Sequence, residues 1–563
     1  MNPMQFDKNK AVTTLTKQLS NRIDVTQAYG QLCGHSTNMT ALLETASIST
    51  KEHTRSLLVL SSALRIRCFG ESVTVLALNA NGKQLIGQLA EMFGEEGRQC
   101  RTETDSELTL SISHQSLQDT IDEQQKLSAD SVLDVLRKIM SLLSVDAHND
   151  KTTMLVGTFS FDCYQLFESL PSVATEQSFP DYDFYLADRL LVVDHINHST
   201  RLISKIFRGD QTEQVYFDYQ NKLSEDEKLL AAVPDDKANQ STGSTSNGNH
   251  AFNIKNIDVK SVNVNLSDSV YSKLVEQAKQ RIIAGDVFQM VLARDFTLPC
   301  SNAFLAYQQL RLSNPSPYMF FVNTPEYQLF GASPESAVKY DASNRSLSIY
   351  PIAGTRRRGL NKDGSVNDDR DARIELELKN DEKEKAEHLM LVDLARNDVA
   401  RVCDSGTRKV ERLLEIDRYS HVMHLVSKVT GQLSENLDAL SAYQACMNMG
   451  TLSGAPKVKA TQLIRQFEGK HRGVYGGAMG YINAAGDMDT AIVIRSALVA
   501  NNTATVSAGA GIVYDSQPKL EIKETENKAA AALQAIHRAN QLVKQQTEQN
   551  AEQKIGKRVN DHG

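Results

Sequence analysis

Short β-prone runs, separated by helical stretches of uneven length, constrain the fold of this chain more than any other feature. Apolar runs with strand character cover Ser56–Phe69, Val73–Ala80, Tyr318–Val322, Leu347–Ile352, Val422–Gly431, Ala491–Val499 and Thr505–Val513. Apolar residues at helical spacing mark Ser128–Leu143 and Ser267–Gly285. These elements do not follow the regular strand–helix–strand rhythm of a doubly wound parallel sheet. We therefore expect an α+β fold with a layered core.

The length of 563 residues predicts two lobes, or one large composite domain with an appended region. The sharpest change of composition lies at Pro234–His250, which is polar and rich in Gly and Ser. We therefore divide the chain into an N-terminal region (1–233), a flexible linker (234–256), a C-terminal domain (257–540) and a frayed, disordered tail (541–563).

The composition excludes several classes of protein. Hydrophobic residues make up 41% and charged residues 23%, and the net charge of −8 gives no reason to propose nucleic acid as a partner. The seven cysteines lack a C-x-x-C pair, which argues against a disulfide framework and a thiolate metal site. No run approaches the roughly 20 apolar residues that a membrane span needs. A cytoplasmic enzyme is expected.

Two pairs of glutamates stand out because each pair is spaced by three residues in a helix-forming segment. Glu384 and Glu387 form one pair, and Glu521 and Glu524 form the other. Such a pair is most often a solvated helix face. If both pairs face one pocket, however, four carboxylates suit a hard cation such as Mg²⁺, which prefers oxygen ligands.

Three glycine-containing segments resemble anion-binding loops. The Gly354-Thr355 turn lets a small anion approach the backbone closely. Ser507–Ile512 lacks the third glycine of a dinucleotide fingerprint, because Tyr514 occupies that position, so it is a carboxylate-binding nest or a plain strand turn. Gly450–Lys457 does not satisfy the phosphate-loop pattern, but Pro456 fits the first turn of a helix, whose N-terminus favours anions.

Three further residues have a structural interpretation on their own. Arg495 lies in a β-like run, where arginine is commonly half-exposed, although its guanidinium suits a carboxylate. His424 belongs to an H-x-x-H pattern, a poor zinc signal that fits a partly buried structural histidine. Glu335, after Ser-Pro, is an ordinary loop acid.

Five segments in one order change this interpretation. The chain reads Asn-Pro-Ser-Pro-Tyr-Met-Phe-Phe, Gly-Ala-Ser-Pro-Glu-Ser, Pro-Ile-Ala-Gly-Thr-Arg-Arg-Arg, Glu-His-Leu-Met-Leu-Val-Asp-Leu-Ala-Arg-Asn-Asp and Gly-Thr-Leu-Ser-Gly-Ala-Pro-Lys at 314–321, 331–336, 351–358, 387–398 and 450–457. In this order they resemble the chorismate-utilising enzymes, and nearly the whole chain resembles the anthranilate synthase large-subunit family. The resemblance implies a core of two packed antiparallel β-sheets flanked by helices.

The resemblance also implies a role for each candidate residue. The catalytic residues would be Glu335, as the acid that protonates the departing C4 hydroxyl of chorismate, His424, which would assist the later elimination, and Thr451 near the ring. Substrate-binding residues would be Gln289, Ala353, Gly354, Thr355, Tyr475, Arg495, Gly509, Gly511 and Lys528. A Mg²⁺ ion would be held by Glu387 and Glu524 directly, with Glu384 and Glu521 behind them.

Two positions distinguish this chain from other family members. Relatives that add water to chorismate carry a lysine base where this chain has Gln289, a much weaker proton acceptor, which disfavours isochorismate and salicylate synthesis. Aminodeoxychorismate synthases, the main enzymatic rival, typically carry a nucleophilic lysine where this chain has Ala353. A regulatory paralogue without activity is the non-enzymatic rival. The intact carboxylates favour a lyase that forms anthranilate and pyruvate in tryptophan biosynthesis.

The resemblance further implies a partner and a regulator. Cys33-Gly34-His35 is not the nucleophile elbow of an amidotransferase, so ammonia would come from a separate glutamine amidotransferase subunit, in a heterotetramer of two large and two small subunits. L-tryptophan would act as feedback inhibitor at Glu44, Thr45, Lys51, Asn314, Pro317, Tyr318 and Met319. Thr45 replaces the usual serine, which is compatible with altered sensitivity.

Overall fold

The computed structural model describes residues 10–19, 23–34, 38–46, 53–96, 99–112, 123–144, 150–233, 262–361, 365–419 and 422–560. All strand pairs in this part of the chain are antiparallel, so the expected α+β class is confirmed. The expected linker (234–256) lies outside the described residues.

The strands form two sheets. The first runs, neighbour by neighbour, through β1 (Val12–Leu19), β9 (Ser199–Phe207), β8 (Tyr182–Asp194), β3 (His53–Phe69), β2 (Thr40–Ala46), β12 (Tyr318–Asn323), β13 (Gln328–Ser333), β22 (Ser496–Ala500), β23 (Thr503–Ile512) and β11 (Gln289–Pro299), with β10 (Asn263–Val264) and β19 (Gly454–Ala455) paired to β11.

The second sheet shares β3 and β8 with the first. It runs through β5 (Gln99–Thr104), β6 (Glu107–Ser111), β4 (Ser72–Ala77), β3, β8, β7 (Met154–Phe159), β20 (Ala478–Asn483), β21 (Met488–Ile492), β14 (Ser336–Asp341), β15 (Ser346–Ile349) and β18 (Val422–Gln432), with β16 (Ile352–Arg357) and β17 (Lys409–Arg418) also paired to β18.

The two long shared strands connect the sheets at a corner. The first half of β3 pairs with β2 and its second half with β4, and between them the register against β8 shifts at Val59–Leu64. Such bulges let a strand bend from one sheet into another. The N-terminal part of the chain thus supplies the strands that join both sheets, and its strands β2 and β7 pair directly with β12 and β20 of the C-terminal part.

Each sheet buries one face against the other sheet and one face against helices. On the first sheet, Leu42 and Phe321 pack in an apolar cluster with residues of the outer helices. Ala41 and Val322 point the other way and pack in the apolar layer between the two sheets. On the second sheet, Met154 faces the same inner layer. This alternation follows from the two-residue repeat of a strand. Both faces are apolar because both are covered.

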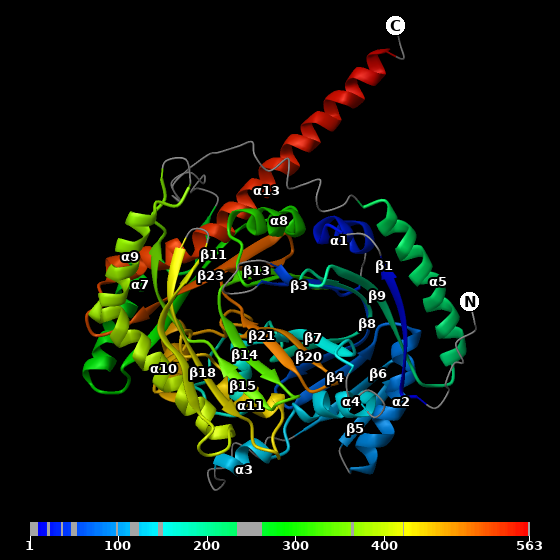
Figure 1. Cartoon of the computed structure of the whole chain (residues 1–563), viewed down its shortest axis with the longest axis horizontal. Helices are drawn as coiled ribbons and strands as arrows, with labels where there is room; N and C mark the ends of the chain where they lie inside the picture. The colour runs from blue at the N-terminus through cyan, green and yellow to red at the C-terminus, as the bar shows by residue number, and fades with distance from the viewer. Residues whose placement is uncertain are drawn as a thin grey trace.

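Helices cover the two outer faces, as Figure 1 shows. The first sheet packs on α1 (Val25–Cys33), α8 (Ala303–Ser313) and α13 (Pro518–Asn560), and the second on α2 (Ala80–Glu95), α4 (Asp134–Ser144), α10 (Glu382–Val402) and α11 (Ala439–Cys446). The remaining helices are α3 (Glu123–Ser128), the 3₁₀ turn η2 (Phe161–Leu166), α5 (Thr212–Ala231), α7 (Asp268–Ile283), α9 (Asp368–Asn380) and α12 (Lys457–Glu468).

Three expectations from the sequence need correction. The tail is helical to Asn560 as part of α13, because its Gln, Lys and Glu residues are good helix formers and Lys544 lies 4.0 Å from Glu548 one turn on. The run Ala491–Val499 is divided between β21 and β22. The stretch Ser128–Leu143 is helical only from Asp134, since α3 ends at Ser128 and non-helical backbone follows it.

The seven cysteines are free thiols. Within the described part of the chain, no helix combines the length and apolar character that a membrane crossing requires.

Candidate active site

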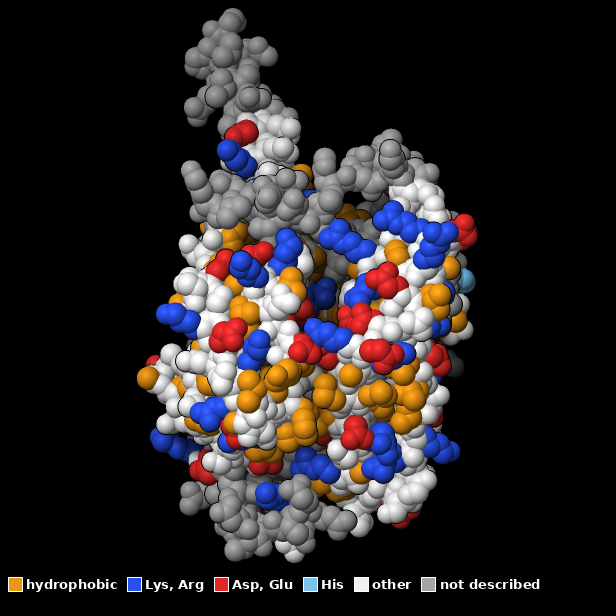
Figure 2. All heavy atoms as spheres, turned by 90° about the vertical axis from the view of Figure 1, so that its left-hand side faces the viewer, with side chains coloured by type: hydrophobic (Ala, Val, Ile, Leu, Met, Phe, Trp, Pro, Cys, Tyr) orange, Lys and Arg blue, Asp and Glu red, His pale blue; other side chains and the backbone are white. Residues whose placement is uncertain are grey.

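One cavity of about 1190 Å³ brings together every residue that the sequence analysis assigned to catalysis, substrate binding or metal binding. Its lining includes Glu335, His424, Thr451, Gln289, Ala353, Gly354, Thr355, Tyr475, Arg495, Gly509, Gly511, Lys528, Glu384, Glu387, Glu521 and Glu524. The walls come from β11 and β23 of the first sheet, β16 and β18 of the second, α10, and the start of α13. Figure 2 shows a hollow rimmed by charged side chains on the side of the molecule where α9 and α10 lie.

The Gly354-Thr355 pair lies in strand β16, at a bulge. Gly354 has a φ of 65°, and the register against β18 shifts between Ala353 and Thr355. The left-handed backbone angle favours glycine here, and a Cβ on Gly354 would lie 3.1 Å from Oε2 of Glu384, so that carboxylate would have to shift slightly. Beyond the bulge, Thr355 pairs with His424, and their side chains share a 2.9 Å hydrogen bond.

Glu335 lies between β13 and β14 and is buried at the cavity wall. The hydroxyl of Thr451 donates a 3.0 Å hydrogen bond to its Oε1. Burial raises the pKa of Glu335 to about 8, and the bond from Thr451 offsets part of that rise. The carboxyl therefore holds its proton at neutral pH and can act as a general acid.

Helix α10 carries the first pair of glutamates on its cavity side. Glu384 accepts a 2.8 Å bond from Arg356, whose other amine donates to Asp381, the N-cap of α10. Lys383 lies 3.6 Å from Glu387. Burial, followed by the charges of the other three glutamates, raises the pKa of Glu387 to about 7, an effect that Lys383 partly offsets.

A buried histidine fixes the rotation of α10. His388 is buried and shares a 2.7 Å hydrogen bond with Ser427 of β18. Burial lowers the pKa of His388 to about 4, so the ring is neutral at pH 7. Because the next residue in the helix is fixed in this way, Glu387 points to the cavity in a defined direction.

The second pair of glutamates lies at the start of α13. Burial raises the pKa of Glu521, and Lys528 contacts Glu524 at 2.7 Å while donating to the backbone oxygen of Gly509 at 2.9 Å. The fully buried Arg294 of β11 donates to Thr525 Oγ1 at 2.9 Å and to the carbonyl oxygen of Ile522 at 3.2 Å. Arg294 therefore holds the first turns of α13 against the first sheet.

The four carboxylates are the type of oxygen ligand that a divalent cation prefers, but their side chains do not converge on a single point. Among the described residues, no group of three or more His, Cys, Asp or Glu side chains is close enough to hold a metal ion. Instead, Arg356 and Lys528 neutralise Glu384 and Glu524. The pKa of Glu387 is raised first by burial and then by the charges of the neighbouring glutamates, and a cation beside the carboxylate would favour its ionised form. The residues fit Mg²⁺, and its binding remains a prediction.

Arg495 lies in a break between β21 and β22, not within a strand. Its φ is 51°, and its backbone oxygen accepts a 3.2 Å bond from the N–H of Ala332. Its guanidinium makes no ion pair within 4 Å in the described chain, and burial lowers its pKa. Among the cavity's basic side chains, this arginine is available to an anionic ligand. Tyr475 lies beside it on the same wall, and burial raises the pKa of Tyr475 to about 12.

The segment Ser507–Ile512 is neither a nest nor a turn. It forms a regular part of β23, and neither Gly509 nor Gly511 has a positive φ. Its glycines make room instead: a Cβ on Gly509 would lie 3.1 Å from the Tyr475 hydroxyl, and one on Gly511 would lie 3.1 Å from Nε2 of Gln289.

The segment Gly450–Lys457 is also not a helix-terminal anion site. Helix α12 begins at Lys457, and β19 separates it from Thr451. Lys457 is buried and donates to Asp398 at 2.7 Å and to the carbonyl oxygen of Cys446 at 2.8 Å. Lys457 therefore fixes α12 to α10 and is not part of the cavity.

Four of the residues expected to bind tryptophan lie in the β2–β12 strand pair, on its two faces. Thr45 is opposite Tyr318, and Glu44 is opposite Met319. Glu44 faces α8, where Arg311 donates to it at 2.8 Å; Thr45 lies on the other face. The carbonyl oxygen of Pro317 accepts a hydrogen bond from the backbone N–H of Ala46 in β2. Asn314 instead lines the main cavity. Lys51 lies outside the described residues.

Among the cationic residues of the cavity that sequence reasoning did not assign to the site, Arg356 and Lys383 lie next to the glutamates of α10. Arg356 bridges β16 to α10, although it directly follows the Gly-Thr pair. Lys383 lies one helical turn before Glu387 and lines the same wall. The spacing of four residues between Lys383 and Glu387 was the available signal.

These features agree with comparisons with known proteins. The family model described as chorismate binding enzyme matches residues 94–534. The chain therefore belongs to the family of chorismate binding enzymes.

Curated relatives give the group within the family. The chain is 45% identical over 532 residues to anthranilate synthase component 1 of Escherichia coli (strain K12), covering 93% of this chain and 97% of that protein. It is 46% identical over 529 residues to anthranilate synthase component 1 of Serratia marcescens, and the match covers 94% of this chain and 98% of that protein. It is a member of the anthranilate synthase component 1 group.

Solved structures agree with the fold. Anthranilate synthase component I from Streptococcus pneumoniae TIGR4 aligns with a TM-score of 0.60 and 27% identity, covering 85% of this chain and 92% of that one. The menaquinone-specific isochorismate synthase of Escherichia coli aligns with a TM-score of 0.63, covering 94% and 95%. Its identity is 17%, so it supports the fold alone.

The raised pKa of Glu387 predicts a stability difference that depends on pH. An unfolded glutamate has a pKa of about 4.3, so the folded state loses stability as pH rises from about 4.3 to about 7, where the folded carboxyl ionises. Glu387→Gln cannot ionise. In urea unfolding at pH 8, we expect the free energy of unfolding of this variant to exceed that of the wild type by on the order of 1 to 3 kcal/mol. At pH 4.5 we expect the two free energies of unfolding to be nearly equal.

Glu382→Gln is the matched control, because Glu382 lies on the same helix with its side chain 88% exposed. An equal difference between Glu387→Gln and wild type at both pH values would contradict the prediction.

Proposed function

We propose that this chain converts chorismate and ammonia to anthranilate and pyruvate, in the first committed step of tryptophan biosynthesis. The observation that carries the proposal is Glu335, a carboxyl that keeps its proton at neutral pH, in one cavity with Arg495 and four further carboxylates. A proton donor, an available guanidinium and a potential cation site suit a substrate that carries carboxylates and must lose a hydroxyl group.

The first step adds ammonia at C2 of the chorismate ring. As the C2–N bond forms, the ring double bonds shift and the C4–O bond breaks, while Glu335 donates its proton so that the hydroxyl leaves as water. Thr451 orients the carboxyl through its 3.0 Å bond. Arg495 binds a substrate carboxylate, and the backbone at Gly354 allows close approach of the ring substituents.

The second step eliminates the enolpyruvyl group. The C2 proton leaves, the C–O bond to the side chain breaks, and the released enolpyruvate takes up a proton to become pyruvate. His424, held by Thr355 at 2.9 Å, is the candidate to assist this proton transfer. When bound by Glu387 and Glu524, with Glu384 and Glu521 behind them, Mg²⁺ supplies charge neutralisation for the ring carboxylate.

Two cavity residues favour this reaction over its rivals. Ala353 lines the cavity without an amine, so no covalent lysine adduct can form there. Gln289 has an amide in place of a basic amine, which disfavours activation of water. Ammonia is then the nucleophile.

We propose a separate glutamine amidotransferase as the source of ammonia, with two large and two small subunits in the assembly. At neutral pH free ammonia is mostly ammonium, so direct delivery is an advantage. The relatives bear the name component 1, which implies a second component. We place the assembly in the cytoplasm.

We also propose feedback inhibition by L-tryptophan. The segment from Asn314 to Met319 supports this proposal, because Asn314 lines the cavity while Tyr318 pairs with Thr45 of β2. A ligand that moves β2 against β12 would therefore displace one cavity wall.

The purified chain, given chorismate, excess ammonium and Mg²⁺, is expected to release fluorescent anthranilate, and to release none with glutamine in place of ammonium. A metal chelator is expected to abolish turnover. Glu335→Gln, which keeps the shape but cannot donate a proton as an acid, is expected to lower kcat by about 10² to 10⁴. An aminodeoxychorismate product, or turnover without metal, would contradict the proposal.

The rate is expected to fall as pH rises through about 8, because Glu335 then loses its proton. Thr451→Val removes the hydrogen bond that lowers this pKa, so the alkaline limb of log kcat against pH is expected to move to higher pH. Thr451→Ser keeps the hydroxyl and is the control. A limb that stays in place in Thr451→Val would show that another group controls it.

L-tryptophan is expected to lower the ammonium-dependent rate, whereas the same concentration of L-phenylalanine is not. The comparison is made in the anthranilate fluorescence assay over a range of chorismate concentrations. Full activity at saturating L-tryptophan would remove this part of the proposal.

A further inference from the structure

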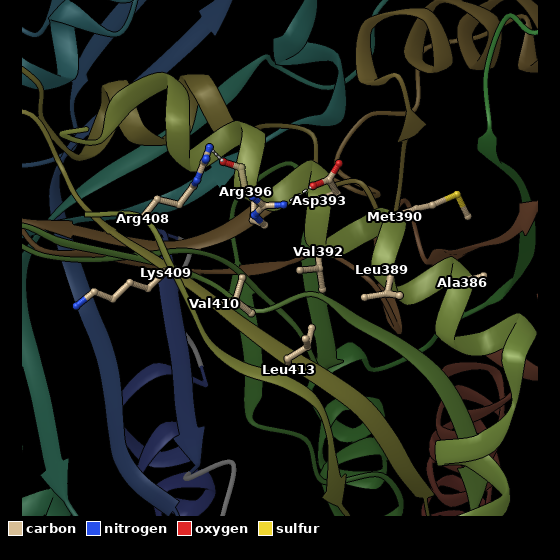
Figure 3. Close-up of a pocket in the computed structure, with 10 residues that line it drawn as sticks. All are labelled: Ala386, Leu389, Met390, Val392, Asp393, Arg396, Arg408, Lys409, Val410 and Leu413. Atoms are coloured by element: carbon tan, nitrogen blue, oxygen red, sulfur yellow. Dashed lines mark hydrogen bonds and ion pairs between the residues drawn. The ribbon is translucent and has the colours of Figure 1, made fainter. Parts of the chain in front are cut away.

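A second hollow lies apart from the main cavity. Figure 3 shows it between α10 and β17, and its volume is about 740 Å³. Its lining shares no residue with the main cavity, and two of its charged side chains, Asp393 and Arg396, bond to each other at 2.7 Å. The candidate acid Glu335 and its partner Thr451 are supported from elsewhere, by the segment that follows α12.

Arg472 lies in that segment, and its side chain is only 3% exposed. Its Nε donates to Oε2 of Glu468 at 2.8 Å. Its Nη1 donates to the carbonyl oxygen of Leu452 at 2.8 Å, and its Nη2 donates to that of Val291 at 2.7 Å. Glu468 in turn accepts a 2.8 Å bond from the backbone N–H of Ala293. Arg472 and Glu468 therefore tie strand β11 to the loop that contains Leu452.

That loop carries the hydroxyl that bonds to the candidate acid. Leu452 directly follows Thr451, and both residues line the main cavity. The backbone N–H of Leu452 donates to the carbonyl oxygen of Met449 at 2.9 Å, so the backbone is fixed on both sides of Leu452. The position of the Thr451 hydroxyl, which donates to Glu335 at 3.0 Å, depends on this backbone.

The guanidinium of Arg472 is itself held in one place. Its central carbon lies 4.5 Å from the centroid of the Phe161 ring of η2 and 5.8 Å from that of the Tyr475 ring, within the range of cation–π attraction. Asp162 of the same turn accepts a 2.6 Å bond from the N–H of Gly473, which fixes the adjacent backbone. A planar guanidinium with several fixed partners is a rigid support, which a flexible ammonium is not.

We propose that Arg472 is a positioning residue for the reaction: through the carbonyl oxygen of Leu452, it holds the Thr451 hydroxyl against Glu335. Arg472 does not line the main cavity, so it acts through Thr451 and not on the substrate. This inference rests on the proposed function, in which Glu335 is the proton donor. It adds that a residue behind the cavity wall sets how strongly Glu335 holds its proton.

The other groups that act on Glu335 can be told apart from Arg472. Burial raises the pKa of Glu335, and three donors lower it: the hydroxyl of Thr451, the backbone N–H of Ile352 and the ammonium of Lys528. Tyr419 is also close, because burial, followed by the charges of Asp417 and Glu335, raises the pKa of that phenol. Within the described chain, Arg472 donates a hydrogen bond to none of these groups, so its effect on Glu335 passes through the loop of Thr451.

The test is Arg472→Lys in the full chain. Lysine keeps a positive charge beside Glu468, but one ammonium cannot replace the fork of donors that reaches both carbonyl oxygens. With Leu452 released, the bond from Thr451 weakens, and the pKa of Glu335 is expected to rise by about 0.5 to 1 pH unit. The readout is the infrared band of the protonated carboxyl as pH is raised through about 8, taken as the difference between each protein and its Glu335→Gln counterpart.

Two further results are expected if Arg472 acts through Thr451. The alkaline limb of log kcat against pH, in the ammonium-dependent reaction, moves to higher pH together with the infrared titration. In a Thr451→Val background, Arg472→Lys adds no further shift, because the hydrogen bond through which it acts is already absent.

Arg465→Lys is the matched control. Arg465 of α12 is also a buried arginine, with its side chain 5% exposed, and it donates to Asp162 at 2.8 Å in the same cluster. In the part of the chain that the structure describes, it donates to neither Leu452 nor Val291. The control is expected to lose a similar amount of stability in urea unfolding and to leave the pKa of Glu335 unchanged.

An unchanged pKa of Glu335 in Arg472→Lys would overturn the inference and leave Arg472 with a structural role alone. An equal shift in the Thr451→Val background would also overturn it, because Arg472 would then act by another route. If Arg472→Lys does not fold, Glu468→Gln/Arg472→Gln, which removes both buried charges together, is measured in its place. Absence of anthranilate from the wild type would defeat the proposed function instead, whereas the infrared titration needs no turnover and still decides the role of Arg472.

Discussion

The two bent strands β3 and β8 are the constraint on which the rest of the structure depends. Each takes part in both sheets, and the bulge at Val59–Leu64 sets the angle between them. The apolar layer between the sheets, with Val59 and Met479 from opposite sides, then fixes their distance. This placement is what lets β11 and β23 of one sheet face β16 and β18 of the other across a single cavity.

The electrostatics of the cavity follow from burial in that frame. Removal from water raises the pKa of Glu335 and of Glu387, while Arg495 is kept without an ion pair in the part of the chain that the structure describes. Each of these states is unfavourable for the isolated protein. Under the proposed function, a divalent cation would stabilise the charge of Glu387, an anionic substrate would stabilise the charge of Arg495, and the proton held by Glu335 would be available for catalysis.

Local sequence signals predicted the elements that carry the site better than the geometry of the site. The strands that contain His424 and Gly511 and the helices that contain Glu387 and Glu524 were all expected from periodicity and propensity. The break at Arg495 was missed, because a left-handed φ in a β-prone run has no local signal. The nest expected around Gly511 was wrong, since strand pairing with β11 overrides the turn preference of glycine.

The sequence by itself determined the class of fold, the family and the set of candidate site residues, because these depend on residue type, spacing and motif order. It also determined that Ala353 and Gln289 offer no amine. Only the tertiary structure decided which charges meet: that Arg356 neutralises Glu384, that Thr451 orients Glu335, and that Lys457 is a buried anchor. The physical reason is that pairing and desolvation depend on distances between segments far apart in the chain, and no local pattern encodes those distances.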